Sequence, residues 1–239
     1  MLHSESMKDV YPMRINKYLA MKNHSTRRGA DELIKKHLVL INGRFAVLGD
    51  KVEEADTVEV RANKKALIYE YYAYNKPVGT VTLAPTSGQK DIKGSINLAG
   101  VFPVGRLDKD SHGLIILTND GRITDRLLNP KHTHEKEYVV TVKEKLRANF
   151  KNKIEPGVQI ENEKTLPCKV QILGEKKFSI VLGEGKKHQI RRMCSALFAE
   201  VEDLERVRIM NIKLGKLGSN QYKKIEGEEL AIFLKSLGL

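Results

Sequence analysis

The clearest pattern along the chain is a short apolar run, Leu114 to Leu117, bounded on both sides by polar turn residues. The preceding loop, residues 104–113, holds two acids, a serine and a histidine. Asn119-Asp120-Gly121 closes the run, and these residue types tolerate left-handed backbone angles. A short apolar run between turn signals predicts a buried strand. We therefore expect the acidic loop to be held at the end of a core strand, as an active site requires.

The first sixty residues combine helical spacing with one hairpin signal. Ile15 and Leu19 share a helix face, and Ser25 or Thr26 can cap a second helix. Asn42-Gly43 between β-type residues predicts a type I′ hairpin, because that turn needs positive φ at both central positions. Together these signals predict two small helices and a hairpin. The second helix would present the stripe Ala30, Leu33, Ile34 and His37.

The remaining chain alternates strand and helix patterns. Four tyrosines at 69, 71, 72 and 74 could form a platform for stacking bases, but alternating tyrosines in a strand favour core packing. A helix that opens after Gly183 leaves Arg191 and Arg192 off its apolar stripe, where a cationic pair needs an acid or phosphate nearby. The expected strands cover residues 67–74, 135–142, 168–173 and 178–182, and the other expected helices cover 146–154 and 228–237.

The composition indicates which chemical class of partner the protein binds. Lys and Arg number 42 against 30 Asp and Glu, a formal net charge of +12, which favours a polyanionic partner, most often nucleic acid. Cys168 and Cys194 are too few for a disulfide scaffold and indicate a reducing compartment. No apolar run approaches a membrane span, and residues 1–9 lack a signal-peptide core. We expect a cytoplasmic protein without a membrane partner.

Several kinds of site fit the polar residues poorly. Asp108-x-Asp110 begins like a calcium loop, but position 12 is Asn119 where a glutamate is needed. The residues His132, His134, Cys168 and Cys194 match no zinc spacing, so we expect no metal. Ser111 beside His112 lacks the context of a hydrolase pair. What remains is Asp108, a candidate covalent nucleophile that needs a fixed cation such as Arg191 or Arg192. A structural salt bridge is the alternative.

The N-terminal segment resembles the S4 RNA-binding module. The similarity rests on Arg14-Ile-Asn-Lys-Tyr-Leu-Ala, Ser25-Thr-Arg-Arg-Gly-Ala-Asp-Glu-Leu-Ile and Val39-Leu-Ile-Asn-Gly. Between Arg14 and Arg44 lie eight Lys or Arg and two acids, which favours a phosphate-contacting surface over a merely solvated helix face. By the resemblance, the RNA-facing residues would be Arg14, Lys17, Arg27, Arg28 and Asn42.

Four segments of the larger part, in order, resemble the rRNA pseudouridine synthases of the RsuA, RluB, RluE and RluF group, and the F type most of all. These segments are Asn75-Lys-Pro-Val-Gly, residues 102–121, Glu135-Lys-Glu-Tyr-Val-Val and His188-Gln-Ile-Arg-Arg-Met. The group carries an S4 module in front. Its F type modifies a 23S rRNA hairpin and, in some members, a tRNA anticodon loop.

The resemblance implies a role for each matching residue. Asp108 would attack the target uridine at C6 of the base or at C1′ of the sugar, Arg191 would pair with it, and Tyr138 would pack on the base. Arg106 would fill the gap left by the flipped nucleotide, and Lys76 would lie near the site as one of the RNA-binding residues. Further RNA contacts would come from Lys187, Gln189 and Arg192. Substrate and product are isomers, so no cofactor is expected.

The expected fold is α+β: an S4-like domain at residues 13–61 and a catalytic domain at 68–239 with a mixed, mainly antiparallel sheet. A tail at 1–12 and a linker at 62–67 complete the chain. We expect a monomeric RNA pseudouridine synthase. The competing hypotheses are a non-catalytic RNA-binding or ribosome-assembly factor and a metal-dependent nuclease that uses Asp108 and Asp110.

Overall fold

The computed structural model describes residues 10–22, 24–61, 68–83 and 88–239. The chain divides into two compact units, Met1–Tyr69 and Glu70–Leu239. The linker expected at 62–67 and most of the expected tail lie outside the described residues.

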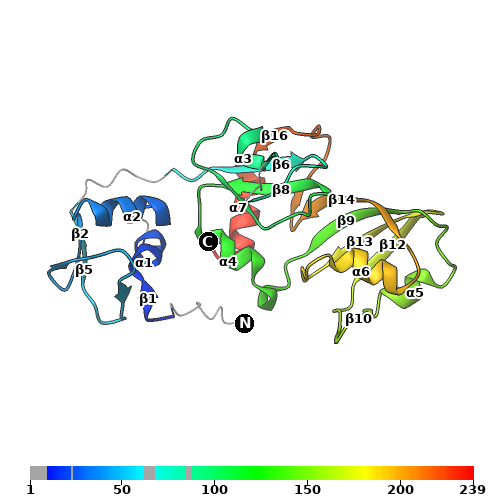
Figure 1. Cartoon of the computed structure of the whole chain (residues 1–239), viewed down its shortest axis with the longest axis horizontal. Helices are drawn as coiled ribbons and strands as arrows, with labels where there is room; N and C mark the ends of the chain where they lie inside the picture. The colour runs from blue at the N-terminus through cyan, green and yellow to red at the C-terminus, as the bar shows by residue number, and fades with distance from the viewer. Residues whose placement is uncertain (1–9, 23, 62–67, 84–87) are drawn as a thin grey trace. The chain divides into compact units, whose positions relative to one another are not determined.

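The first unit contains the two predicted helices and the predicted hairpin (Figure 1). Thr26 caps the second helix, since its Oγ1 accepts a hydrogen bond from the Gly29 amide at 3.1 Å. Ala30 and Ile34 are buried, but the helix ends before His37, which has a φ of 54°. The elements are β1 (Met13–Arg14), α1 (Ile15–Met21), α2 (Arg27–Lys35), β2 (Val39–Ile41), β3 (Arg44–Phe45), β4 (Lys51–Val52) and β5 (Val58–Val60).

The hairpin turn has the geometry that its sequence predicts. Asn42 and Gly43 have φ angles of 50° and 81°, positive at both positions as a type I′ turn requires. Strand β2 lies between β3 and β5 in a three-stranded sheet, and its three residues are buried. Val39 and Ile41 of this strand pack with Ile15, Leu19, Ala30 and Ile34 of the helices in the core of this unit.

The second unit is built on a nine-stranded sheet whose main path runs β12-β13-β9-β14-β8-β6-β16, with β15 on β14 and β7 on β8. The β8–β14 pair is parallel and the other strand pairs are antiparallel, so the predicted mixed, mainly antiparallel α+β fold is confirmed. The strands are β6 (Tyr71–Lys76), β7 (Phe102–Val104), β8 (His112–Thr118), β9 (Lys136–Val142), β12 (Lys169–Gly174), β13 (Lys177–Leu182), β14 (Val201–Ile209), β15 (Ile212–Lys213) and β16 (Tyr222–Lys224).

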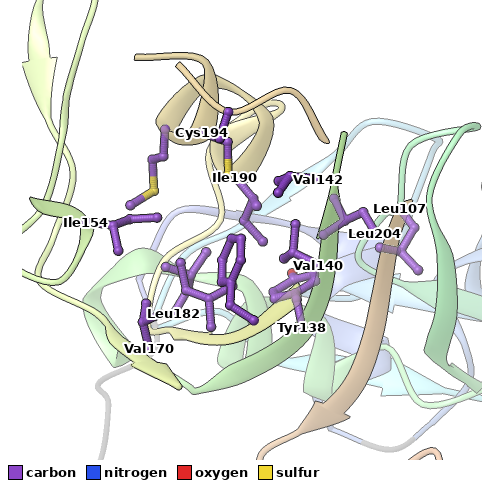
Figure 2. Close-up of a cluster of buried hydrophobic side chains, with 14 of the residues drawn as sticks. Leu107, Tyr138, Val140, Val142, Ile154, Val170, Leu182, Ile190, Cys194 and Leu204 are labelled. Carbon is purple, nitrogen blue, oxygen red and sulfur yellow. The ribbon is translucent and has the colours of Figure 1, made fainter. Parts of the chain in front are cut away.

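Helices cover this sheet and close its core. Figure 2 shows the cluster in which β9, β13 and β14 meet α5 and α6, with Tyr138, Val140 and Ile190 among its buried side chains. The helices are α3 (Ile92–Ser95), α4 (Arg122–Leu128), α5 (Phe150–Ile154), α6 (Gln189–Ala196) and α7 (Gly227–Ser236), with a 3-10 turn η1 (Pro130–His132) and a small hairpin of β10 (Gln159–Ile160) and β11 (Glu163–Lys164).

The predicted strand at Leu114–Leu117 is confirmed, and all four residues are fully buried. Core packing is confirmed for three of the four tyrosines, because Tyr71, Tyr72 and Tyr74 are buried in β6, whereas Tyr69 lies before the strand and is half-buried. That strand continues through Lys76, two residues into the segment predicted as a turn. Helix α5 is shorter than predicted, and Val201–Ile209 is a strand that the pattern did not predict.

Candidate active site

Asp108 lies in the loop between β7 and β8, and hydrogen bonds fix that loop on both sides of it. The hydroxyl of Thr82 donates to the carbonyl of Leu107 at 2.8 Å and accepts from the Leu107 amide at 3.1 Å. The Gly79 amide donates to the carbonyl of Lys109 at 2.8 Å. Leu107 itself is buried in the core cluster of Figure 2. The segment that follows β6 therefore holds the backbone around Asp108, as an active-site loop requires.

The Asp108 carboxylate is partly open to solvent, with 41% of the side chain exposed. The basic group within 4.0 Å of it, in the described part of the chain, is the imidazole of His188, whose Nε2 lies 3.4 Å from Oδ1. His188 is the residue before α6 and has a φ of 51°. We did not predict this contact, although His188 belongs to the same motif as Arg191.

Arg191 was expected to pair with Asp108, and in the structure it contacts the loop elsewhere. Its Nη2 donates to the carbonyl of Asp110 at 3.0 Å and lies 3.4 Å from Oγ of Ser111, and its Nη1 donates to the carbonyl of Val201 at 3.2 Å. Over the described residues, no ion pair within 4.0 Å joins Arg191 to Asp108. The guanidinium thus holds the main chain of the loop, two residues beyond the carboxylate.

Lys76 is fully buried at the end of β6, which corrects its expected place among RNA-contacting residues. Its Nζ donates to the carbonyls of Pro77 at 2.9 Å and Thr80 at 2.7 Å. Burial lowers the pKa of Lys76 to about 8, and the carboxylates of Asp108 and Asp110 act in the opposite direction. Lys76 therefore interacts electrostatically with the carboxylates of the loop from a buried position, in which its side chain has no surface for contact with RNA.

Tyr138 is buried in β9, in the cluster that contains Leu107 (Figure 2). Its cross-strand neighbour on β14 is Arg206, a residue that sequence reasoning missed. Burial, and then the charge of Arg206, lowers the pKa of Lys136 to about 8. No sequence pattern marked this residue, because five of the nine residues of β14 are charged; in the strand, Arg206 lies two residues after buried Leu204 and is itself buried.

The other predicted contacts of this unit fall into two groups. Arg106 and Lys187 are exposed, and Arg192 forms an ion pair with Glu161 at 2.9 Å. Gln189 is buried. Its side-chain nitrogen donates to the Glu184 carboxylate at 2.7 Å, and its side-chain oxygen accepts from the Lys186 amide at 2.9 Å. Its expected contact with RNA is corrected to a role in holding the turn before α6.

In the first unit, Arg14, Lys17, Arg27 and Arg28 are exposed. The Nη2 atom of Arg27 lies 3.5 Å from Oδ1 of Asn16. Asn42 instead braces the hairpin: its Nδ2 donates to Asp56 at 2.7 Å and its Oδ1 accepts from the Thr57 amide at 2.9 Å. Both polar atoms of the Asn42 side chain thus form hydrogen bonds within the first unit.

Within the described ranges, no group of three or more His, Cys, Asp or Glu side chains is placed to hold a metal ion. None of the described helices has the length and apolar character needed to cross a bilayer.

Comparisons with known proteins identify the family of this chain. Residues 70–196 match the family model for RNA pseudouridylate synthase, and residues 13–58 match the S4 domain. The dual-specificity RNA pseudouridine synthase RluF of Escherichia coli (strain K12) is 38% identical over 228 residues, which cover 93% of this chain and 79% of RluF. Ribosomal large subunit pseudouridine synthase B of Bacillus subtilis (strain 168) is 33% identical over 228 residues, which cover 91% of this chain and 93% of the relative.

A crystal structure of pseudouridylate synthase superposes with a TM-score of 0.68 at 28% identity and covers 94% of this chain and 99% of that one. With an S4 domain in front of a synthase domain that the family model matches, the chain belongs to the RNA pseudouridine synthases, in the group that includes the RsuA, RluB and RluF types.

Proposed function

We propose that this enzyme isomerises one uridine in a structured hairpin of 23S rRNA, with Asp108 as the nucleophile. The observation that carries the proposal is a carboxylate on a loop whose neighbouring backbone groups are hydrogen-bonded. Nε2 of His188 lies 3.4 Å from this carboxylate, and buried Lys76 interacts with it electrostatically. A chain of net charge +12 suits a polyanionic substrate. RluF and large-subunit synthase B, as relatives, support rRNA as that substrate.

The reaction breaks the bond between C1′ and N1 of the uridine and forms a bond between C1′ and C5. The proton at C5 is lost and N1 gains one, so atoms balance without a redox partner. The base must turn within the site, which is impossible inside a stack, and the nucleotide is therefore flipped out. Asp108 attacks the flipped uridine at C6 or C1′, and its attack requires the ionised carboxylate.

In this proposal, nearby residues assist the steps of the reaction. The imidazole of His188 lies 3.4 Å from the Asp108 carboxylate, and buried Lys76 interacts with that carboxylate electrostatically. Tyr138 offers a ring at the edge of the core cluster for the base to pack on. Exposed Arg106, two residues before Asp108, fills the space that the flipped nucleotide leaves.

The first unit binds the flanking RNA through Arg14, Lys17, Arg27 and Arg28. A tRNA anticodon loop is a second substrate in this proposal, supported by the similarity to RluF, a dual-specificity synthase. We propose further that the enzyme acts as a monomer in the cytoplasm, where Cys168 and Cys194 stay as the free thiols that the structure contains.

One experiment tests the reaction and the substrate. Unmodified 23S rRNA and tRNA are incubated separately with the wild type and with Asp108→Asn in the presence of a chelator, and pseudouridine is mapped by carbodiimide primer extension. We expect one modified position with the wild type and none with the variant. Modification by Asp108→Asn would refute the role of the carboxylate. Tight binding without modification would favour an RNA-binding factor, and strand cleavage restored by magnesium would favour a nuclease.

A further inference from the structure

Arg206 contacts the backbone on both sides of Asp108, at Arg106 in the loop and at Leu114 in strand β8. The residue lies in β14 and is 4% exposed. Its Nε donates to the carbonyl of Leu114 at 2.7 Å, and its Nη1 forms a longer contact, 3.4 Å, with the carbonyl of Arg106. Asp108 lies between these two carbonyls in the chain. One planar guanidinium therefore links the first part of the loop to the strand that follows it.

The main chain of Arg206 also defines where the loop ends. Strand β14 pairs in parallel with the start of β8, with Arg206 opposite Gly113. A Cβ at Gly113 would lie 2.4 Å from the carbonyl oxygen of Arg206, and Gly113 has a φ of 102°. This close approach needs glycine. The loop is thus bound to one residue of β14 through both its side chain and its backbone.

The charge of Arg206 is not matched by an acid. Among the described residues, no carboxylate lies within 4.0 Å of its guanidinium, and Nη2 is buried without a hydrogen-bond partner. Its charge disfavours the protonated forms of its neighbours Lys76 and Lys136. A buried cation among cations opposes folding, so stability alone does not explain its presence.

We propose that Arg206 is a positioning residue for the isomerisation, because its guanidinium ties the Asp108 loop at Arg106 to strand β8 at Leu114 and so holds the carboxylate where it attacks the uridine. This inference rests on the proposed role of Asp108. A lysine at position 206 keeps the charge but lacks the planar fork that reaches both carbonyls. The proposal therefore concerns the shape of the guanidinium and not its charge alone.

The test compares Arg206→Lys and Arg206→Met with a matched control, Arg208→Lys. Arg208 lies two residues further along β14 and forms ion pairs with Glu137 at 2.8 Å and Glu135 at 3.1 Å. For each full-length protein, we would measure the single-turnover rate with excess enzyme on an RNA that the wild type modifies, the Kd for that RNA, and the Tm. Rates are measured at a temperature at which circular dichroism shows each variant folded.

We expect Arg206→Lys to lower the single-turnover rate about 100-fold, since a misplacement of about 1 Å costs that much. The Kd should stay within about threefold, because Arg206 is buried away from the RNA. Arg206→Met should lose rate similarly, and Arg208→Lys should keep the wild-type rate.

A wild-type rate in Arg206→Lys would overturn the proposal. Failure of Arg206→Lys to fold would also overturn it, since the contact would then serve the fold itself. Activity in Asp108→Asn would instead refute the proposed nucleophile, whatever the Arg206 variants show.

Discussion

Nε2 of His188 lies 3.4 Å from Oδ1 of Asp108, while Arg191, three residues further along the chain, donates to the backbone of the same loop. One motif at the start of α6 thus serves the loop in two ways. His188 acts on the carboxylate and Arg191 acts on the main chain. Because 48% of the His188 side chain is exposed, solvent screens its attraction for Asp108.

Replacing His188 with glutamine should lower the single-turnover rate only about two- to fivefold, because exposed ion pairs contribute about 1 kcal/mol or less. The loss should shrink further in 0.5 M salt (roughly a 4 Å screening length), measured at saturating enzyme. Lys187→Gln is the control, since this exposed neighbour should change the Kd for RNA and leave the rate unchanged. A loss beyond about 100-fold would contradict a screened pair and indicate a direct part for His188 in the chemistry.

Removing charge from the S4 unit should weaken RNA binding and reduce its dependence on salt. The triple variant Arg14→Gln, Lys17→Gln and Arg28→Gln should lower the slope of log K against log salt by about 2 to 3, if each side chain meets one phosphate. Fluorescence anisotropy at several salt concentrations measures the slope. Arg44→Gln is the control, because Arg44 is paired with Asp50 at 2.7 Å. An unchanged slope in the triple variant would argue against this surface as the RNA-binding one.

The buried position of Gln189 predicts a stability effect without a binding effect. Gln189→Leu removes hydrogen bonds to the buried Glu184 side chain and to the Lys186 amide, which should lower the free energy of unfolding by about 1–3 kcal/mol. The Kd for RNA should not change. Urea denaturation and anisotropy measure the two quantities. Weaker RNA binding at unchanged stability would restore the original expectation that Gln189 contacts RNA.

Lys76 predicts a particular dependence of stability on pH. Its pKa is about 8 in the folded protein and 10.5 as an ordinary lysine, so the unfolded chain binds more protons between these values. Raising the pH through this window should therefore stabilise the wild type, by roughly 3 kcal/mol from this one residue. Lys76→Met should lack this gain.

The comparison must be between the two proteins, because Lys136 also has a pKa of about 8 and titrates in the same window in both. Urea denaturation at pH 7.5 and 10.5 gives the four free energies of unfolding. Equal changes in the wild type and in Lys76→Met would show that the buried lysine does not carry this dependence.

Local patterns predicted the parts of the fold that local chemistry determines. The Asn42-Gly43 hairpin and the apolar strand at Leu114–Leu117 both depend on a few adjacent residues. Strand β14 was not predicted, because five of its nine residues are charged and its pairing is supplied by β8 and β9 on either side. Its tertiary neighbours override its composition.

The same distinction applies to the site. The segment that carries Asp108 could be identified from the sequence, because its residues are contiguous. Arg191 was predicted as the partner of the carboxylate, but it contacts the backbone of the loop instead. Arg206 was not predicted, because its side chain reaches the loop through a geometry that no sequence spacing specifies. Gln189 shows the limit most clearly, since the residue faces inward although its neighbours Lys187 and His188 are exposed.

The parallel pairing of β8 with β14 has a consequence for folding. Parallel neighbours cannot form from a local hairpin, and β14 follows β8 only after β9, β12, β13 and α6. Contacts of high sequence separation form slowly, because a long loop must close before they stabilise the chain. Arg206 arrives at the Asp108 loop with β14. A nascent or partly folded chain would therefore lack an ordered nucleophile, and competence to modify RNA would appear together with completion of the sheet.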